Sequence, residues 1–208
     1  MNHSKVRTVA ECINNGEQPD ILFWVGSAGS FDDRAKKISQ AFVKILNAAN
    51  INFAVLGEEE SSSGDAAKRA GNEFLFQMQA LMNIEVLNSY NIKNIVTTCP
   101  HSYNTLKNEY SGLGGNYNVL HHTEFISNLI DEKKIILKSK IDYKKLTYHD
   151  PCYLGRGNDI YDAPRKLIDF LYGRLEGGTR TEKRTENEQI CCTRAEGHKA
   201  KGSEGRSI

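Results

Sequence analysis

Short apolar runs alternate with longer amphipathic segments along most of the chain. The runs have about the length of a β-strand and are rich in β-branched and aromatic residues. They read "ILFWVG", "INFAVLG", "NIVTTC", "YNVLHH" and "KLTYHDPC". Between them, residues 31–50 and 64–90 are predicted to be helical, because apolar residues recur there at helical intervals. Strands and helices in this alternating order predict an α/β fold with a mainly parallel sheet and flanking helices.

The ends of the predicted strands are where functional groups are expected. In parallel sheets such groups gather at the carboxyl ends of the strands, where the chain turns into a helix. Ser27, Cys99 and Cys152 each follow a predicted strand in this way. Asp32 and Asp33 open the first helical segment, and we expect them to cap it because carboxylates complement the positive end of a helix.

The composition is that of an ordinary globular protein. The chain has 208 residues, 39% hydrophobic and 25% charged, with a formal net charge of +1. Nucleic acid is not expected as the main partner, because proteins that bind it usually carry a strong basic excess. Residues 1–20 are polar, and the apolar run at 21–25 is too short to cross a bilayer. We therefore expect a cytoplasmic protein without direct membrane insertion.

Five cysteines stand at positions 12, 99, 152, 191 and 192. In a reducing compartment such residues serve as ligands, redox groups or buried hydrophobes more often than as disulfides. Cys99 looks like half of a metal site, since it follows a strand and precedes a helix. The position that would close a Cys-x-x-Cys pair, however, is occupied by Ser102.

A weak internal repeat predicts two similar lobes. Residues 22–38 and 146–168 share an apolar run, then Ser27 or Cys152, a glycine, an acidic residue, an arginine and a helical apolar residue. The predicted divisions are a polar extension (1–20), a first lobe (21–135), an incomplete second lobe (136–192) and a tail (193–208). The tail has little apolar surface to bury and is expected to be disordered.

Several long strings resemble the cysteine-rich CCG proteins related to heterodisulfide reductase, specifically to its B-type polypeptide. They are "FWVGSAGSFDDRA", "GEEESSSGDAAKRAGNEFLFQ", "TTCPHSYNTLKNEY", "GGNY", "HHTEF" and "YHDPCYLGR". The resemblance implies two CCG repeats that bind iron–sulfur clusters or, in one lobe, zinc. It also implies electron transfer with other iron–sulfur or flavoprotein subunits, as in glycolate or lactate oxidation.

The resemblance also implies which residues are ligands. The implied metal ligands that are cysteine here are Cys99, Cys152, Cys191 and Cys192. Serine occupies three implied ligand positions of the first lobe: Ser27, Ser62 and Ser102. Serine is a hard oxygen donor that holds iron–sulfur clusters less readily than thiolate does. We therefore expect impaired cluster binding, and a redox-inactive scaffold or binding protein with the same fold is the alternative.

Two further kinds of site remain open. Four histidines could join cysteines in a zinc site at the sheet edge, or could be hydrogen-bonded boundary groups: His101, His121, His122 and His149. A nucleotide could bind at "VGSAGSF", but Ala28 stands where a dinucleotide-binding turn needs its second glycine. The acidic run at 58–60 is interpreted as a solvated loop rather than as a ribose-binding group.

Overall fold

The computed structural model describes residues 6–137 and 148–172. Its sheet has four parallel strands in the order β2-β1-β3-β4. They are β1 (Ile21–Trp24), β2 (Phe53–Ala54), β3 (Asn94–Thr97) and β4 (Asn118–His121). The predicted α/β fold with a parallel sheet is confirmed. The strands are shorter than the apolar runs, and next to β2 an isolated bridge pairs Thr8 with Val55.

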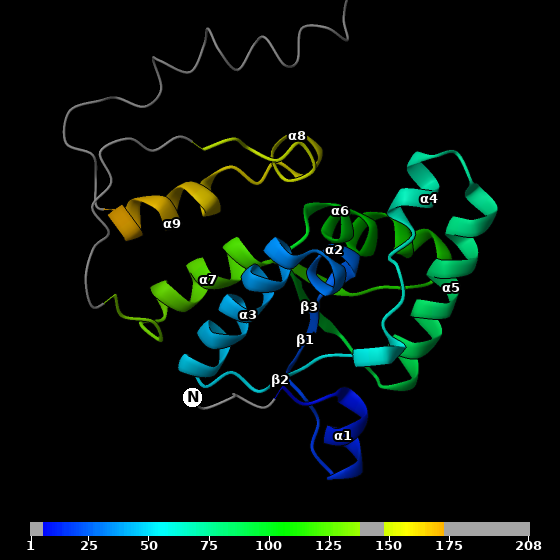
Figure 1. Ribbon diagram of the computed structural model, residues 1–208, viewed down its shortest axis with the longest axis horizontal. Helices are drawn as coiled ribbons and strands as arrows, with labels where there is room; N and C mark the ends of the chain where they lie inside the picture. Colours follow the sequence, from blue (N-terminus) through cyan, green and yellow to red (C-terminus); the bar gives the residue numbers. More distant parts are fainter. Residues whose placement is uncertain (1–5, 138–147, 173–208) are drawn as a thin grey trace, which may run out of the picture. The chain divides into compact units, whose positions relative to one another are not determined.

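Helices cover both faces of the sheet (Figure 1). One face packs against α3 (Asp33–Ala48) and α7 (His122–Asp131), and the other packs against α5 (Glu73–Ser89). The shorter elements are α1 (Val9–Asn14), α2 (Gly26–Phe31), η1 (Gly57–Glu59), α4 (Asp65–Arg69), α6 (Pro100–Asn104), the π-helix η2 (Thr105–Glu109) and η3 (Tyr110–Leu113). Two helices follow residue 148: α8 (Gly155–Asn158) and α9 (Asp162–Tyr172).

Alternation along β1 explains how both faces are filled. Leu22 and Trp24 are fully buried on the α5 side, whereas Phe23 is buried on the α3 side, edge-on to Phe42. Cys12 of α1 is also fully buried in the cluster on the α5 side. The amino-terminal helix therefore contributes to the core, and Cys12 behaves as a small hydrophobe.

Local signals set the helix boundaries. The Asp32 side chain accepts a hydrogen bond from Ala35 N at 2.8 Å, so it is the N-cap of α3, as predicted. The single helical stretch predicted at 64–90 is wrong, because the chain breaks into α4 and α5. Gly71 takes a φ of +79°, and Asn72 caps the new helix by accepting from Leu75 N at 3.1 Å.

The prediction for the strand ends needs two corrections. β4 ends at His121, and His122 is already the first residue of α7 rather than the end of the strand. In "KLTYHDPC", residues 148–151 are not a strand, and Cys152 begins a turn that leads into α8. The rest of that run lies outside the described residues.

The segment after Cys152 packs on the first part of the chain. α9 contacts α7, and Lys166 forms an ion pair with Asp131 at 2.5 Å. The short α8 followed by the longer α9 has the same order as α2 and α3. Cys191, Cys192 and the expected disordered tail at 193–208 lie outside the described residues. Within the described parts of the chain, no helix is long and apolar enough to cross a membrane.

Candidate functional site

The strand order creates a topological switch point between β1 and β3. From β1 the chain leads to β2 on one side, and the connection after β2 crosses back to β3 on the other side. The segments that leave the carboxyl ends of β1 and β3 therefore diverge, and such a crevice is the usual ligand site of an open α/β sheet. Ser27 follows β1 and Cys99 follows β3, so two of the predicted residues lie at this edge.

Two of the implied ligand positions of the first lobe, Cys99 and Ser102, lie next to Gly26. A Cβ atom on Gly26 would lie 3.5 Å from Ser102 Oγ and 3.9 Å from Cys99 Cβ. It would also lie 4.0 Å from Cδ1 of the fully buried Trp24, whose neighbouring Nε1 has no hydrogen-bond partner among the described residues. Ser102 is buried, Cys99 is half-buried and Ser27 is exposed. The edge therefore combines one thiol with several hydroxyl groups.

Glu60 is the charged group of this edge. Its Oε1 accepts a hydrogen bond from Gly26 N at 2.6 Å, and its Oε2 accepts one from Val25 N at 3.0 Å. Burial raises the pKa of Glu60 to about 7, against the opposing effect of these two N–H donors. The interpretation of residues 58–60 as a solvated loop is therefore wrong at Glu60, although Glu58 and Glu59 are exposed. The carboxylate also occupies the N–H groups that a nucleotide phosphate would need.

A buried amide holds the loop that carries Ser62. Asn83 of α5 donates from Nδ2 to Ser62 O at 2.8 Å and to the Tyr110 hydroxyl at 2.9 Å. The Ser61 hydroxyl donates to Asn83 Oδ1 at 2.9 Å, and the Tyr110 hydroxyl donates to Ser63 O at 3.0 Å. Ser62 Oγ in turn accepts from the backbone N–H of Gly64 at 3.2 Å. The Ser62 loop is thus fixed by internal hydrogen bonds.

His101 is held by a buried carboxylate. Its Nδ1 lies 2.8 Å from Oδ2 of Asp65, which is only 8% exposed. Asp65 Oδ1 also accepts from Arg69 Nε at 3.2 Å and is 3.4 Å from the Thr105 hydroxyl. Because Nδ1 is engaged, the free nitrogen of His101 is Nε2.

The turn at Cys152 packs next to His101. The ring of Tyr153 lies against the His101 ring, with 4.4 Å between centroids. Asn158 Nδ2 donates to Asn104 Oδ1 at 3.0 Å and ties α8 to α6. Cys152 itself is exposed. The segment with the predicted second-lobe ligand therefore lies against the helix that follows Cys99.

His121 is buried, His122 is half-buried, and both are engaged within the protein. The His121 Nδ1 lies 2.8 Å from the Thr123 hydroxyl, and its Nε2 lies 3.2 Å from both Thr98 O and His122 Nδ1. Burial is the main cause that lowers the pKa of His121 to about 3 and that of His122 to about 4. His121 uses both ring nitrogens and is not free to bind a metal. His149 is exposed.

The side chains available as ligands determine whether the described residues could bind a metal ion or an iron–sulfur cluster. Within residues 6–137 and 148–172, no group of three or more His, Cys, Asp or Glu side chains is arranged to hold a metal ion. The first lobe offers the single thiol of Cys99, and protein-bound iron–sulfur clusters are usually held by four thiolates. The first lobe therefore does not fit a cluster held by its own residues. Cys152 is exposed and fits the role of one thiolate ligand.

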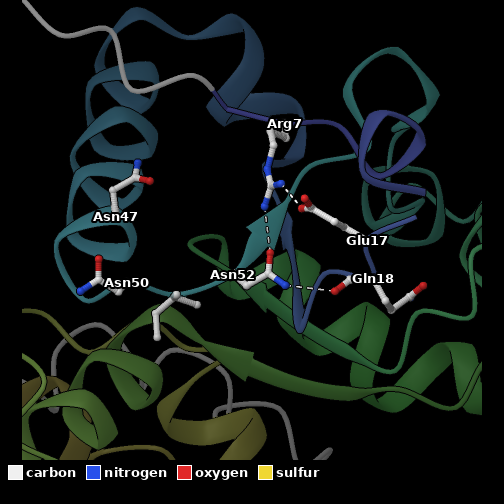
Figure 2. A pocket seen from close by; sticks show the side chains of 7 residues that line it. Arg7, Glu17, Gln18, Asn47, Asn50 and Asn52 are labelled. Atoms are coloured by element: carbon white, nitrogen blue, oxygen red, sulfur yellow. Dashed lines mark hydrogen bonds and ion pairs between the residues drawn. The ribbon is translucent and has the colours of Figure 1, made fainter. Parts of the chain in front are cut away.

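A polar hollow lies at the opposite edge of the sheet. It has a volume of about 590 Å³ and is lined by residues that precede β1 and β2 and by Asn47 in the last turn of α3. Figure 2 shows the Arg7 guanidinium paired with Glu17 and bonded to Asn52 Oδ1 at 3.0 Å. Asn52 donates to Gln18 O at 3.0 Å. These polar groups bind one another, so the hollow is the weaker candidate.

The sequence did not reveal the roles of three polar side chains at this edge: the half-buried Glu60 and the buried Asp65 and Asn83. These groups became visible only through their distant partners. Glu60 bonds residues 34 and 35 positions away, Asp65 contacts His101 at 36 positions, and Asn83 bonds residues 21 and 27 positions away. One feature of the sequence could have suggested a role for Glu60 and Asp65. They stand just before and just after Ser62, which is an implied ligand position.

Comparison with known proteins identifies the family. The model of the cysteine-rich domain family, CCG, matches residues 21–107 and 146–208. The EtfAB:quinone oxidoreductase of Syntrophomonas wolfei is 44% identical over 173 residues, which is 81% of this chain and 24% of that protein. The probable iron-sulfur-binding oxidoreductase FadF of Bacillus subtilis is 44% identical over 170 residues, which is 82% of this chain and 24% of that protein.

A more distant relative supports the same family. The D polypeptide of the dihydromethanophenazine:CoB–CoM heterodisulfide reductase of Methanosarcina barkeri is 31% identical over 163 residues, which is 76% of this chain and 39% of that polypeptide. No solved structure matches the chain. The chain spans about a quarter of the length of the first two relatives. The two matched stretches and these relatives confirm the predicted resemblance, and the chain belongs to the cysteine-rich CCG domain family.

Proposed function

We propose that this chain is an electron-transfer segment of an iron–sulfur oxidoreductase related to heterodisulfide reductase. The family membership carries the proposal, because relatives over most of this chain are named as iron–sulfur or heterodisulfide oxidoreductases. Its proposed partners are other iron–sulfur or flavoprotein subunits, and its proposed location is the cytoplasm, where thiols stay reduced. The two stretches matched by the family model support a two-lobed division at 21–135 and 136–192.

We assign cluster binding to the second lobe. Cys152 is exposed in a turn against α6, and its proposed co-ligands are Cys191 and Cys192. A cluster bound there would supply one-electron transfer. The chain's own contribution at this point is to hold the turn, since Cys152 O accepts from Arg156 N at 3.0 Å and from Gly157 N at 2.9 Å. Three thiolates require a further ligand from a histidine, a water or another chain.

A redox-inactive scaffold is the second candidate. It is favoured by the first lobe, where Ser61 and Ser62 are engaged in hydrogen bonds within the protein rather than left free as donors to a metal. In that case the fold would be kept as a binding surface, and the thiols would carry no metal.

The test is iron and acid-labile sulfide analysis after anaerobic reconstitution of the full chain. We expect bound iron and visible absorption that Cys152→Ala abolishes and that the matched variant Cys99→Ala retains. Retention in Cys152→Ala together with loss in Cys99→Ala would place the cluster in the first lobe. Absence of iron and sulfide from the parent chain would favour the scaffold, and stoichiometric zinc without sulfide would identify a zinc protein instead.

A further inference from the structure

The outward face of α5 is apolar along several turns. Phe74 is 76% exposed, Met78 46%, Leu81 51% and Met82 57%. Their spacing of four, three and one residues places them in one stripe on the helix. We call these four residues the α5 stripe, and Leu75, which is 40% exposed, lies beside it.

The α5 stripe is separate from the core of the protein. The opposite side of the same helix already packs against the sheet through residues such as Phe76, Ala80 and Leu87. Five of the nine large apolar side chains that are exposed in the described part of the chain belong to α5. Single exposed apolar residues are common on protein surfaces, but a contiguous group on one helix marks an interaction site.

The charges around the α5 stripe restrict its partner. Glu73 precedes Phe74, Glu85 follows Met82 by one turn, both carboxylates are exposed, and α5 contains no Lys or Arg. If two copies paired through this stripe, a parallel arrangement would place each Glu opposite its counterpart. An antiparallel arrangement would place Glu73 opposite Glu85. Like charges disfavour both arrangements, whereas a partner with basic groups at those places would be attracted.

We propose that the α5 stripe binds an amphipathic helix of another protein, whose apolar seam is flanked by Lys or Arg. A stripe with two methionines suits this role, because Met side chains adapt to the shape of an apposed surface. Basic flanks pair with Glu73 and Glu85, and the apolar seam covers the four exposed side chains. The mode is that of a helix laid along an apolar helix face.

The location of the α5 stripe connects it to the switch point. Asn83 lies on the same helix and holds the Ser62 loop at 2.8 Å, while the α5 stripe lies on the opposite face. A partner on α5 would therefore be about one helix diameter, roughly 10 Å, from the loop that borders the carboxyl edge of the sheet. The proposal does not depend on whether a cluster is bound.

The test uses two synthetic helical peptides as probes. Both carry the same leucine seam; one has lysines and the other has glutamates along its flanks. Fluorescence anisotropy with the full chain should show binding of the lysine peptide only. Leu81→Glu should weaken that binding by about tenfold or more, the loss typical of removing one buried anchor. The control Ser89→Glu adds the same charge at an exposed position of the same helix two turns beyond Met82, where it should leave binding unchanged or strengthen it.

Exchanging the charges on α5 tests whether Glu73 and Glu85 select a partner with basic flanks. The double variant Glu73→Lys with Glu85→Lys should reverse the preference and bind the glutamate peptide. Circular dichroism and iron content should match the parent in every variant, which separates this surface from the proposed cluster site.

Four outcomes would overturn the proposal. They are equal binding of both peptides, binding of neither at millimolar concentration, a dimer in sedimentation that Leu81→Glu dissociates, and binding to phosphatidylcholine vesicles that Leu81→Glu abolishes. The third would assign the α5 stripe to a second copy of the chain, and the fourth to a lipid surface.

Discussion

The carboxylate of Glu60 lies 2.6 Å from the backbone nitrogen of Gly26, at the point where β1 turns into α2. Glu60 follows β2, and Gly26 follows β1, so the contact joins the ends of neighbouring strands. It also places a negative group beside Ser102 and Cys99, which lie within 4 Å of a Cβ position on Gly26. A partly buried acid therefore occupies the edge where the first-lobe ligand positions meet.

Glu60 should make the protein less stable as the pH rises from about 4.5 to about 7. Its pKa is about 7 in the folded protein and 4.5 in its ordinary state, so the folded state binds the proton more tightly. The stabilisation is present below the ordinary pKa and is lost as the pH approaches 7. Over this pH range the free energy of unfolding should fall by roughly 3 kcal/mol at most. Glu60→Gln should remove this pH dependence. Urea unfolding across this pH range measures it.

The control for this experiment is Glu58→Gln, which changes an exposed acid in the same loop. Its pH profile should follow the parent. If Glu60→Gln kept the parent slope while remaining folded, the carboxylate would be solvated rather than buried, and the contact with Gly26 would carry no electrostatic cost.

His122 should give the opposite dependence of stability on pH. Burial lowers the pKa of His122 from 6.5 to about 4, so the unfolded state binds the proton more tightly than the folded state does. Stability should fall as the pH drops below about 6.5 and continue to fall until about 4. His122→Phe should weaken this acid dependence and keep an aromatic ring beside Phe42.

Acid titration of the unfolding free energy provides the measurement for His122→Phe. His149→Phe removes an exposed imidazole and is the matched control. An identical acid profile in His122→Phe and the parent would mean that His122 is protonated without cost, contrary to its burial.

The fold could be predicted from sequence because its signals are local. The apolar runs that became β1 and β3 are separated by helical periodicity, and Asp32 caps α3 as its position suggested. The break between α4 and α5 was missed, although Gly71 and Asn72 are typical of such a boundary. The apolar pattern continues across the break and concealed it.

The site could be predicted only in part. Ser27 and Cys99 were placed correctly at the ends of strands, because that rule needs only the order of elements. The role of Glu60 could not be predicted, since its partners come from another strand. The expected convergence of histidines also failed at His121, whose nitrogens bind Thr98 and Thr123. Such choices depend on tertiary packing that a single sequence does not specify.

Asn83→Ala should destabilise the protein by about 1–3 kcal/mol. Asn83 is 1% exposed, and its removal would leave the buried hydroxyl of Tyr110 and the carbonyl of Ser62 without one donor each. Thermal unfolding measures the loss. Asn88→Ala is the control, because it removes a single exposed bond to Tyr117 on the same helix and should cost about 0.5 kcal/mol or less. Equal losses in both variants would show that the buried network contributes nothing beyond a surface hydrogen bond.

Gly64→Ala should be more harmful than Gly71→Ala. Both glycines have positive φ, +85° and +79°, so each change imposes backbone strain of about 1 kcal/mol. At Gly71 the added Cβ would meet nothing within 4 Å, whereas at Gly64 it would lie 2.8 Å from Cδ2 of Phe76. The clash should add about 1–3 kcal/mol. Thermal unfolding of the two variants compares them directly, and equal losses would mean that Phe76 moves aside freely.

Restoring the first-lobe thiols should create a cluster site. Serine stands at Ser27, Ser62 and Ser102, and the contacts of Gly26 and Glu60 show that the segments carrying these positions meet near Cys99. The triple change of these serines to cysteine would supply four thiolates, the number that a cluster usually requires. In a Cys152→Ala background, which removes the proposed second-lobe site, anaerobic reconstitution should then give visible absorption, iron and acid-labile sulfide.

The signal should depend on Cys99, because a further Cys99→Ala change leaves only three thiolates in the first lobe. The control introduces the same number of cysteines at exposed serines elsewhere: Ser30, Ser89 and Ser111. That variant should bind no cluster, since its thiols lie on different elements and do not meet. A full cluster in the Cys152→Ala chain with its serines unchanged, lost on Cys99→Ala, would contradict the prediction. It would mean that oxygen ligands and a single thiolate are sufficient at this edge of the sheet.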